Sequence, residues 1–223
     1  MRMRRKKNLE ARLDEFSEYL IIPRTGDMDF RNAVNHTDYF DIASIFGNDH
    51  PIRLEIGCGK GQFAVEMAKR NPDINFFAVE KFANVLVDAC EKLRESGLQN
   101  LKFINCSAEY LPSFIEPHTV QRIYLNFSCP FPKKAYASHR LTAPHFLSVY
   151  ERLLVPHGEI HQKTDNRQLF EFSINNLSEY GYTLKNVTLD LHSSDFEGNI
   201  VTEYEKRFSD LGFPIFRLEA YIK

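Results

Sequence analysis

The feature that most constrains the fold is an alternation of short apolar runs and helical patterns that begins at Ile52. Apolar runs at 52–56, 75–80, 101–105, 120–127 and 159–163 predict buried strands. The segments between most of them, and Arg167–Tyr180 after the last, carry apolar residues at helical spacing. Strands that alternate with helices predict a doubly wound α/β fold, with a mostly parallel sheet covered on both faces.

The two ends of the chain depart from this alternation. Thr183–Leu191 predicts a further strand, and residues 216–222 alternate apolar and charged side chains, as a half-exposed strand does. This pair predicts an antiparallel edge strand. Residues 1–50 combine a basic tip, a weak helical pattern at 9–19 and a loop-like segment. We therefore expect an arm over residues 1–50, packed on or flanking a domain of residues 51–223.

Composition excludes several classes of protein. Apolar residues make up 43% of the 223 residues, which excludes a mainly disordered chain. The longest aliphatic runs, such as Leu20–Ile22, are far shorter than the ~18 residues that a membrane helix needs. The basic start, Arg2–Lys7, is not followed by an apolar stretch, so we expect neither a secretory signal nor a membrane partner.

Cysteine spacing and charge narrow the class further. The four cysteines form no C-x-x-C pair, which argues against structural zinc and against a disulfide scaffold. We expect a cytoplasmic, thiol-reduced protein without a metal. A net charge of −2 excludes a globally basic nucleic-acid binder, so any such binding must come from local patches.

A glycine-rich turn, Gly57–Gly61, follows the first strand of the alternation and leads into a helix. Glycines let such a turn tighten and let backbone N–H groups approach a ligand. The dinucleotide fingerprint places its third glycine five residues after the first, a position that Gln62 occupies here. A turn without a pyrophosphate seat suits S-adenosylmethionine; a tight turn with no ligand is the alternative.

Polar residues stand at the ends of the next strands. Glu80 ends the second strand, where a carboxylate can accept hydrogen bonds from ribose hydroxyls. After the third strand either Asn105 or Ser107 could meet adenine, and spacing does not choose between them. The fourth strand leads into a loop stiffened by Pro130 and Pro132.

Basic side chains follow in that loop. Lys133, Lys134 and Arg140 would stand on the ligand side of the sheet, where they could meet phosphates. Lys163–Asn166 presents further polar groups after the fifth strand.

Four segments together resemble the bacterial tRNA (guanine-46-N7)-methyltransferases in order and spacing. They are Glu55–Gly61, Leu125–Lys134, Lys163–Arg167 and Thr202–Phe208. The resemblance implies a seven-stranded, Rossmann-like class I methyltransferase fold. It further implies S-adenosyl-L-methionine as cofactor, tRNA as partner and the variable-loop guanine at tRNA position 46 as the methylated base. Oligomeric state stays open between monomer and homodimer.

The resemblance, together with the glycine turn, also implies which residues form the site. The expected cofactor-binding residues are Glu55, Gly57, Gly59, Glu80, Ser107 and Cys129. The expected tRNA-binding residues are Lys133, Asp165, Thr202, Glu203, Tyr204 and Glu205. Cys129 occupies the catalytic position.

Two positions depart from the family pattern, because the family usually has Asp where this chain has Ser107 and Cys129. Guanine N7 has an in-plane lone pair and no proton, so transfer needs alignment rather than a general base. We therefore expect the chemistry to survive. The alternatives are a tRNA- or cofactor-binding relative without turnover, an RNA cytosine-C5 methyltransferase with Cys129 as nucleophile, and a small-molecule methyltransferase. The basic loop and arm argue against the last.

Overall fold

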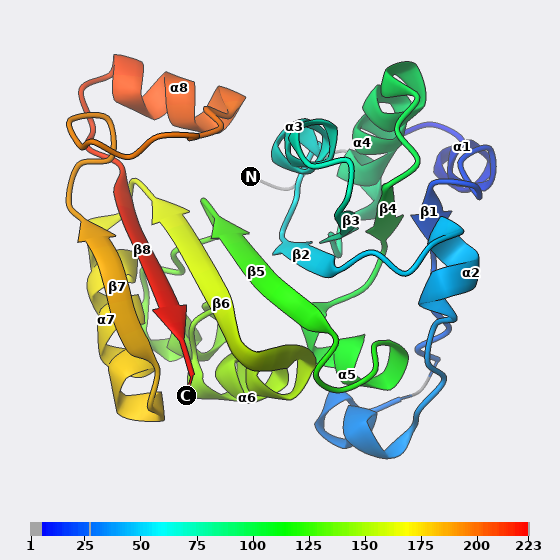
Figure 1. Ribbon diagram of the computed structural model, residues 1–223, viewed down its shortest axis with the longest axis horizontal. Coiled ribbons are helices and arrows are strands. Elements are labelled where there is room, and N and C mark those ends of the chain that lie inside the picture. Colours follow the sequence, from blue (N-terminus) through cyan, green and yellow to red (C-terminus); the bar gives the residue numbers. More distant parts are fainter. Residues whose placement is uncertain (1–5, 27, 223) are drawn as a thin grey trace. The chain divides into compact units, whose positions relative to one another are not determined.

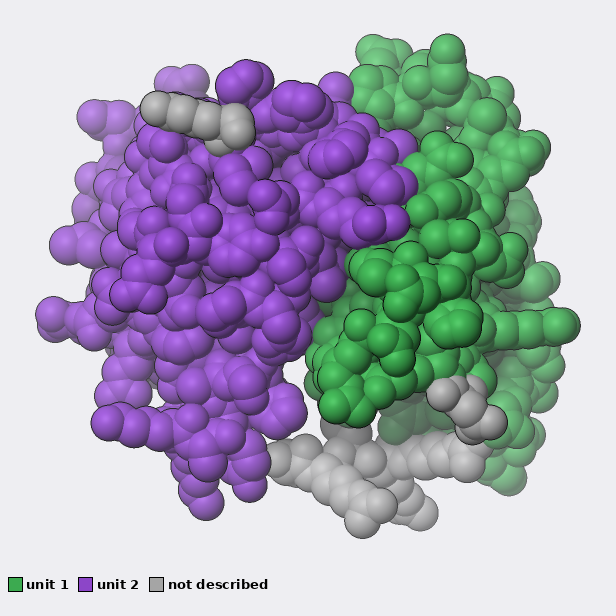
Figure 2. All heavy atoms as spheres, turned by 90° about the horizontal axis from the view of Figure 1, so that it is seen from below, with its two compact units in different colours: residues 1–116 green, residues 117–223 purple. Residues whose placement is uncertain are grey.

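The computed structural model describes residues 6–26 and 28–222. The chain divides into two compact units, Met1–Glu116 and Pro117–Lys223, drawn in green and purple in Figure 2. Within the described ranges there are eight strands, mostly parallel and mostly separated by helices (Figure 1). The predicted α/β fold class is confirmed. The strand beyond the seven expected is β1 (Leu20–Ile21), which lies in the segment predicted as a loop.

Unit 1 contains four parallel strands in the order β1-β4-β3-β2. They are β1, β2 (Ile52–Ile56), β3 (Asn75–Val79) and β4 (Leu101–Ile104). The register pairs the last residue of β2 with the last of β3, and that of β3 with the last of β4. Gly57, Glu80 and Asn105, which follow these strands directly, therefore stand at one edge of the sheet.

Helices cover these strands because their apolar faces fit the buried strand residues. α3 (Gln62–Arg70) and α4 (Ala83–Ser96) pack together, and α3 also contacts β3 and β4. Leu86 and Phe103 are fully buried between these elements, whereas the fully buried Phe77 packs on Phe46 of α2, with 5.0 Å between the ring centres. Shorter helices and turns complete the unit: α1 (Leu9–Asp14), η1 (Phe30–Asn35), α2 (Ile42–Phe46), η2 (Ala108–Tyr110) and α5 (Leu111–Phe114).

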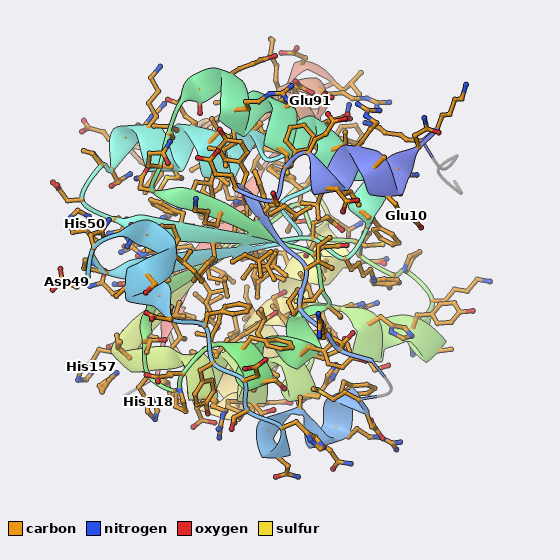
Figure 3. All side chains as sticks on the ribbon, turned by 90° about the vertical axis from the view of Figure 1, so that its right-hand side faces the viewer. Glu10, Asp49, His50, Glu91, His118 and His157 are labelled. Atoms are coloured by element: carbon orange, nitrogen blue, oxygen red, sulfur yellow. The ribbon has the colours of Figure 1, made fainter. Side chains whose placement is uncertain are left out.

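The N-terminal segment packs on α4. Arg12 Nη2 donates to Glu91 Oε1 at 2.6 Å, and the guanidinium of Arg94 lies 4.9 Å from the ring centre of the buried Phe16. Figure 3 labels Glu91 on α4. Residues 1–5 of the predicted basic tip lie outside the described residues, whereas Lys6 pairs with Asp88 of α4.

Unit 2 contains β5 (Val120–Asn126), β6 (Leu154–Thr164), β7 (Thr183–Thr188) and β8 (Phe216–Tyr221), in the order β5-β6-β8-β7. β5 and β6 are parallel, and β8 is antiparallel to both β6 and β7, so β7 forms the edge. α6 (Pro144–Leu153) and α7 (Arg167–Tyr180) cover one face (Figure 1). η3 (Lys134–His139) follows β5, and α8 (Glu203–Asp210) precedes β8.

Among the helices that the structure describes, none is both long and apolar enough to cross a membrane.

Candidate functional site

The glycine turn between β2 and α3 uses its three glycines in two different ways. All three have a positive φ: 78° at Gly57, 54° at Gly59 and 71° at Gly61. A Cβ at Gly61 would lie 2.8 Å from the ring of Phe103, so packing requires glycine there. A Cβ at Gly57 or Gly59 would meet no atom within 4 Å. At these two positions the backbone borders open space, which a ligand can enter.

Glu80 is held at the end of β3 by backbone groups. Its Oε2 accepts from the N–H of Gly59 at 3.2 Å and its Oε1 from the N–H of Phe82 at 3.0 Å. A carboxylate has about four acceptor positions, so two hydrogen bonds leave capacity for ligand hydroxyls. Glu80 is 9% exposed. The structure thus fixes this carboxylate beside the glycine turn.

Two further side chains, those of Glu55 and Cys58, belong to the same strand end and glycine turn. Glu55, at the penultimate position of β2, is buried. Burial, together with the charges of Glu55 and Glu80, raises the pKa of the Cys58 thiol well above its ordinary value. Cys58 therefore stays protonated at neutral pH and is a packing residue rather than a nucleophile.

Asn105 and Ser107, the two candidates for the adenine edge, differ in their contacts. The side-chain amide of Asn105 donates to the backbone carbonyl of Glu80 at 2.8 Å, which ties the ends of β3 and β4 together. The Ser107 hydroxyl donates to Glu109 in the turn that follows. Asn105 thus has a structural task, and adenine contact by Ser107 stays a prediction.

In unit 2, the loop after β5 presents Cys129 at the surface. The other three cysteines are buried, and burial raises the pKa values of Cys90 and Cys106 to about 12. Phe127 and Phe131 have φ values of 49° and 41°, which non-glycine residues rarely adopt. Lys133 and Lys134 follow and are exposed, as expected of groups that meet phosphates.

The expectation that Arg140 faces phosphates is wrong. Its side chain is buried, because Nε donates to the carbonyl of Pro130 and Nη2 to that of Phe131, both at 3.0 Å. Its guanidinium also lies 4.4 Å from the ring centre of Phe172 on α7. Arg140 therefore stabilises the loop that contains Pro130 and Pro132 through buried hydrogen bonds to its backbone.

The Thr202–Glu205 segment forms the start of α8. Thr202 is the N-cap, and its hydroxyl accepts from the N–H of Glu205 at 3.1 Å. Glu203 and Tyr204 are exposed, as residues that contact a substrate need to be. Glu205 is fully buried, so its carboxylate faces the protein interior.

A buried ion pair, which sequence reasoning missed, explains the placement of Glu205. Lys163 Nζ on β6 donates to Glu205 Oε2 at 2.7 Å, and also to Asn199 and to the carbonyl of Ile200 at 2.9 Å each. Asn199 Nδ2 donates to Glu205 Oε1 at 2.6 Å. The pair fastens the start of α8 to the end of β6.

Aromatic rings join α8 to the loop after β5. The ring centre of Tyr204 lies 5.1 Å from that of Phe127 and 4.5 Å from that of Phe208. Partial burial and the nearby charge of Asp165 raise the pKa of Tyr204, and burial raises that of Asp165. Unit 2 thus brings Asp165, Tyr204 and the Cys129 loop together, and unit 1 brings together the glycine turn, Glu55 and Glu80.

A charged cluster on β6 and β8 lies outside these residues. One ligand atom each of Glu159, His161 and Glu219 lies within 4.8 Å of the others, a geometry that could suit a metal ion. The carboxylates are paired instead with cations of the protein: Glu159 with Arg122 and Lys185, and Glu219 with Arg217. The cluster is an ion-pair network.

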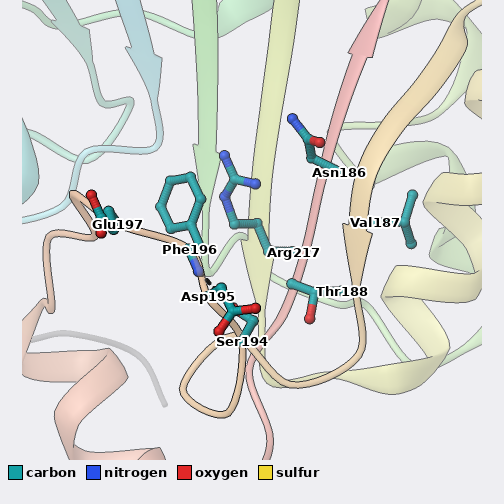
Figure 4. Close-up of a pocket in the computed structure, with 8 residues that line it drawn as sticks. All are labelled: Asn186, Val187, Thr188, Ser194, Asp195, Phe196, Glu197 and Arg217. Atoms are coloured by element: carbon teal, nitrogen blue, oxygen red, sulfur yellow. Dashed lines mark hydrogen bonds between the residues drawn. The ribbon is translucent and has the colours of Figure 1, made fainter.

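Arg217 also lines a surface pocket beside β7. Its guanidinium lies 3.7 Å from the ring centre of Phe196 (Figure 4). The wall also carries Asp195 and Glu197. Glu219 neutralises Arg217, so the charge of this arginine is not available to an anionic ligand in the pocket.

Comparisons with known proteins find relatives that match this chain along most of its length. A family model described as "Putative methyltransferase" matches residues 49–218. A tRNA (guanine-N(7)-)-methyltransferase of Bacillus cytotoxicus is 49% identical over 99% of this chain and 96% of its own length. Proteins of the same name from Bacillus subtilis (strain 168) and Geobacillus sp. (strain WCH70) are 53% and 47% identical, over 79% and 99% of this chain and 83% and 95% of their own lengths.

Solved structures support the fold alone. The 16S rRNA methyltransferase KamB has a TM-score of 0.60 at 16% identity, over 89% of this chain and 94% of its own. A SAM-dependent methyltransferase from Aquifex aeolicus has a TM-score of 0.56 at 14% identity, over 98% of this chain and 100% of its own. With its curated relatives aligned along almost its whole length, the chain belongs to the tRNA (guanine-N7)-methyltransferase family.

Proposed function

We propose that this protein transfers a methyl group from S-adenosylmethionine to N7 of a guanine in tRNA, and that this guanine is at position 46 of the variable loop. The observation that carries the proposal is the 47–53% identity to relatives named for guanine-N7 methylation of tRNA. Position 46 comes from the resemblance of the four motifs. We also propose a cytoplasmic location, because the proposed substrate is tRNA and all four cysteines are free thiols.

The residues at the strand ends of unit 1 fit the adenosyl cofactor. Gly57 and Gly59 border open space, and Glu80 keeps acceptor capacity for two ribose hydroxyls. When bound, S-adenosylmethionine supplies an electrophilic methyl group on a positively charged sulfur. Glu55 adds a buried carboxylate at the same edge, and Ser107 is the candidate for the adenine.

The residues of unit 2 suit the tRNA. Lys133 and Lys134 offer exposed charges for phosphates, and the exposed ring of Tyr204 offers a face on which a base can stack. We assign Asp165, Thr202 and Glu203 to the same substrate surface. Glu205 serves that surface indirectly, by fixing α8 through its ion pair with Lys163.

No proton has to be removed from guanine N7 before it attacks, so the chain needs to orient the base rather than to supply a base catalyst. Cys129 in place of the family's Asp removes an acceptor and a charge. We expect slower transfer and weaker binding than with Asp at this position, with the reaction itself retained.

The test is methylation of an unmodified tRNA transcript, with the modified base mapped by cleavage at N7-methylguanosine. We expect one methyl group per tRNA, at guanine 46, and none in a transcript with adenine at that position. A 5-fluorocytosine-containing transcript is the test of the second chemistry, because Cys129 is an exposed thiol. A covalent adduct would favour cytosine-C5 methylation. Cofactor and tRNA binding without transfer would indicate a relative that has lost turnover.

Cofactor binding is tested separately with Glu80→Ala in calorimetry. A bond from a hydroxyl to a carboxylate contributes about 1.5–3 kcal/mol, so affinity for S-adenosylmethionine should fall by roughly one to two orders of magnitude. An unchanged affinity in the folded variant would refute the ribose assignment.

A further inference from the structure

We propose that Arg140 is a positioning residue for methyl transfer, which acts by fixing the loop of residues 127–133 in the conformation that presents Cys129 and Lys133. The inference rests on the proposed function for its kinetic consequence. Its structural part, the fixing of the loop, stands on contacts within unit 2.

The loop contains two prolines, which lack N–H groups, so it cannot be held by the regular hydrogen bonds of a strand. Phe131, between them, has a φ of 41°, a conformation that a non-glycine side chain keeps only when its surroundings impose it. Arg140 supplies this constraint by donating to two successive carbonyls, those of Pro130 and Phe131, at 3.0 Å each.

Arg140 is itself held by α7. Its guanidinium lies 4.4 Å from the ring centre of Phe172, and two residues further on the Thr142 hydroxyl is 2.8 Å from that of Ser173. Both hydroxyl-bearing residues are fully buried. A contact between the rings of Phe131 and His139, at 5.5 Å, closes the loop on its other side. A continuous set of contacts therefore joins a regular helix to the loop.

The geometry of these contacts is specific to arginine. The guanidinium is planar and can direct two N–H groups at neighbouring acceptors while one face lies on a ring. A lysine would keep the charge but could not make both hydrogen bonds and the stacking contact at once. Arg140→Lys thus separates the charge of this residue from its geometry.

The experiment compares Arg140→Lys with Lys134→Ala, which removes an exposed charge from the start of η3, directly after the loop. For Arg140→Lys we expect kcat to fall roughly 10- to 100-fold, the range for losing one hydrogen bond from a charged group. The KM for tRNA should change less than kcat, and the slope of log affinity against log salt should stay unchanged, because Lys133 and Lys134 keep their charges. For Lys134→Ala we expect the slope to decrease by about one and the KM for tRNA to rise, because a phosphate contact is lost.

A second readout does not depend on activity. The N–H of Tyr136 bonds to the carbonyl of Lys133 at the end of the loop, at 3.0 Å, and the N–H of Arg140 bonds to that of Ala137 in η3, at 3.1 Å. Hydrogen exchange of these two amides therefore reports opening of the loop's end and of the turn that follows it. In Arg140→Lys their exchange should be roughly tenfold faster or more, while amides of β5 and α7 exchange as in the parent. If Arg140→Lys does not fold, Phe172→Leu removes the stacking ring alone and should accelerate the same amides.

Two results would overturn the proposal. One is a reduced salt slope with unchanged exchange, which would make Arg140 a phosphate contact. The other is faster exchange with unchanged kcat, which would leave Arg140 with a purely structural role. If the parent transfers no methyl group to tRNA, the proposed function fails, whereas the exchange data still decide whether Arg140 fixes the loop.

Discussion

The buried pair between Lys163 and Glu205 gives the sharpest test of how α8 is held. Glu205 is fully buried and Lys163 is 6% exposed, with 2.7 Å between Nζ and Oε2. Removing one partner of a buried pair leaves the other charge without compensation, at a cost of about 3–5 kcal/mol. In Lys163→Met, Glu205 would keep the amide of Asn199 at 2.6 Å and the imidazole of His192 at 3.2 Å, so we expect the lower end of this range.

For a chain of this size, about 3 kcal/mol corresponds to a decrease in Tm of roughly 6–12 °C. Calorimetric unfolding of the parent and of Lys163→Met measures it. The matched control is Lys206→Met on α8, the helix that carries Glu205, because Lys206 makes an exposed pair with Asp210 at 3.0 Å. Such a surface pair contributes little, so the control should lie within about 2 °C of the parent.

The double variant Lys163→Met/Glu205→Leu tests the reason for the effect. When both charges are replaced by apolar side chains, the cost of burying an unpaired charge disappears, and most of the lost stability should return. A Tm for Lys163→Met within about 2 °C of the parent would refute the argument. So would a double variant that is less stable than Lys163→Met.

Three further predictions concern packing at the glycine turn, the protonation of His161 and the role of Cys129. Gly61→Ala should lower the free energy of unfolding by about 2–4 kcal/mol, because the alanine would have a positive φ and its Cβ would collide with Phe103. Gly59→Ala should lower it by only about 1–2 kcal/mol, because no atom lies near the added Cβ. Urea unfolding of the two variants measures both values. Burial and the charge of Arg122 lower the pKa of His161 from 6.5 to about 4, so between these values the unfolded chain binds more protons and stability falls as the pH decreases. From pH 7.5 to 5 this loss should be about 2 kcal/mol, and it should be absent in His161→Gln. Cys129→Asp should raise kcat for tRNA methylation by restoring an acceptor, and a decrease would contradict the assigned role.

The regular part of the fold could be predicted from the sequence because its elements repeat a clear pattern. Ile52–Ile56 and Arg167–Tyr180 have the predicted bounds. β1 was missed because two residues are too few to show a period, and it is a strand only through its pairing with β4. β6 begins at Leu154 rather than at Glu159, with a register shift against β5 that no local pattern indicates.

α8 was missed although its start carries a local signal. Thr202 followed three residues later by Glu205 is the spacing of a capping box, and Thr202 is indeed the N-cap. Glu205 does not complete the box, because its carboxylate is engaged by Lys163. That contact joins residues 42 positions apart, so only the folded chain reveals it.

For the candidate site, the sequence located the strand ends and the residue types that stand there. It did not give the direction of long side chains. Arg140 was expected outside, yet it points inward because two carbonyls and the ring of Phe172 receive it. Contacts of this kind depend on the backbone path of a loop, which composition and period do not encode.

We propose that alignment of guanine N7 with the cofactor's methyl group suffices for transfer, with no covalent help from Cys129. Single-turnover methylation of a tRNA transcript by the parent and by Cys129→Ser, at saturating S-adenosylmethionine, tests it most directly. We expect N7-methylguanosine at tRNA position 46 from both proteins, with most of the rate kept in Cys129→Ser. Loss of transfer in folded Cys129→Ser that still binds tRNA and cofactor would contradict it, because a hydroxyl does not replace a nucleophilic thiolate.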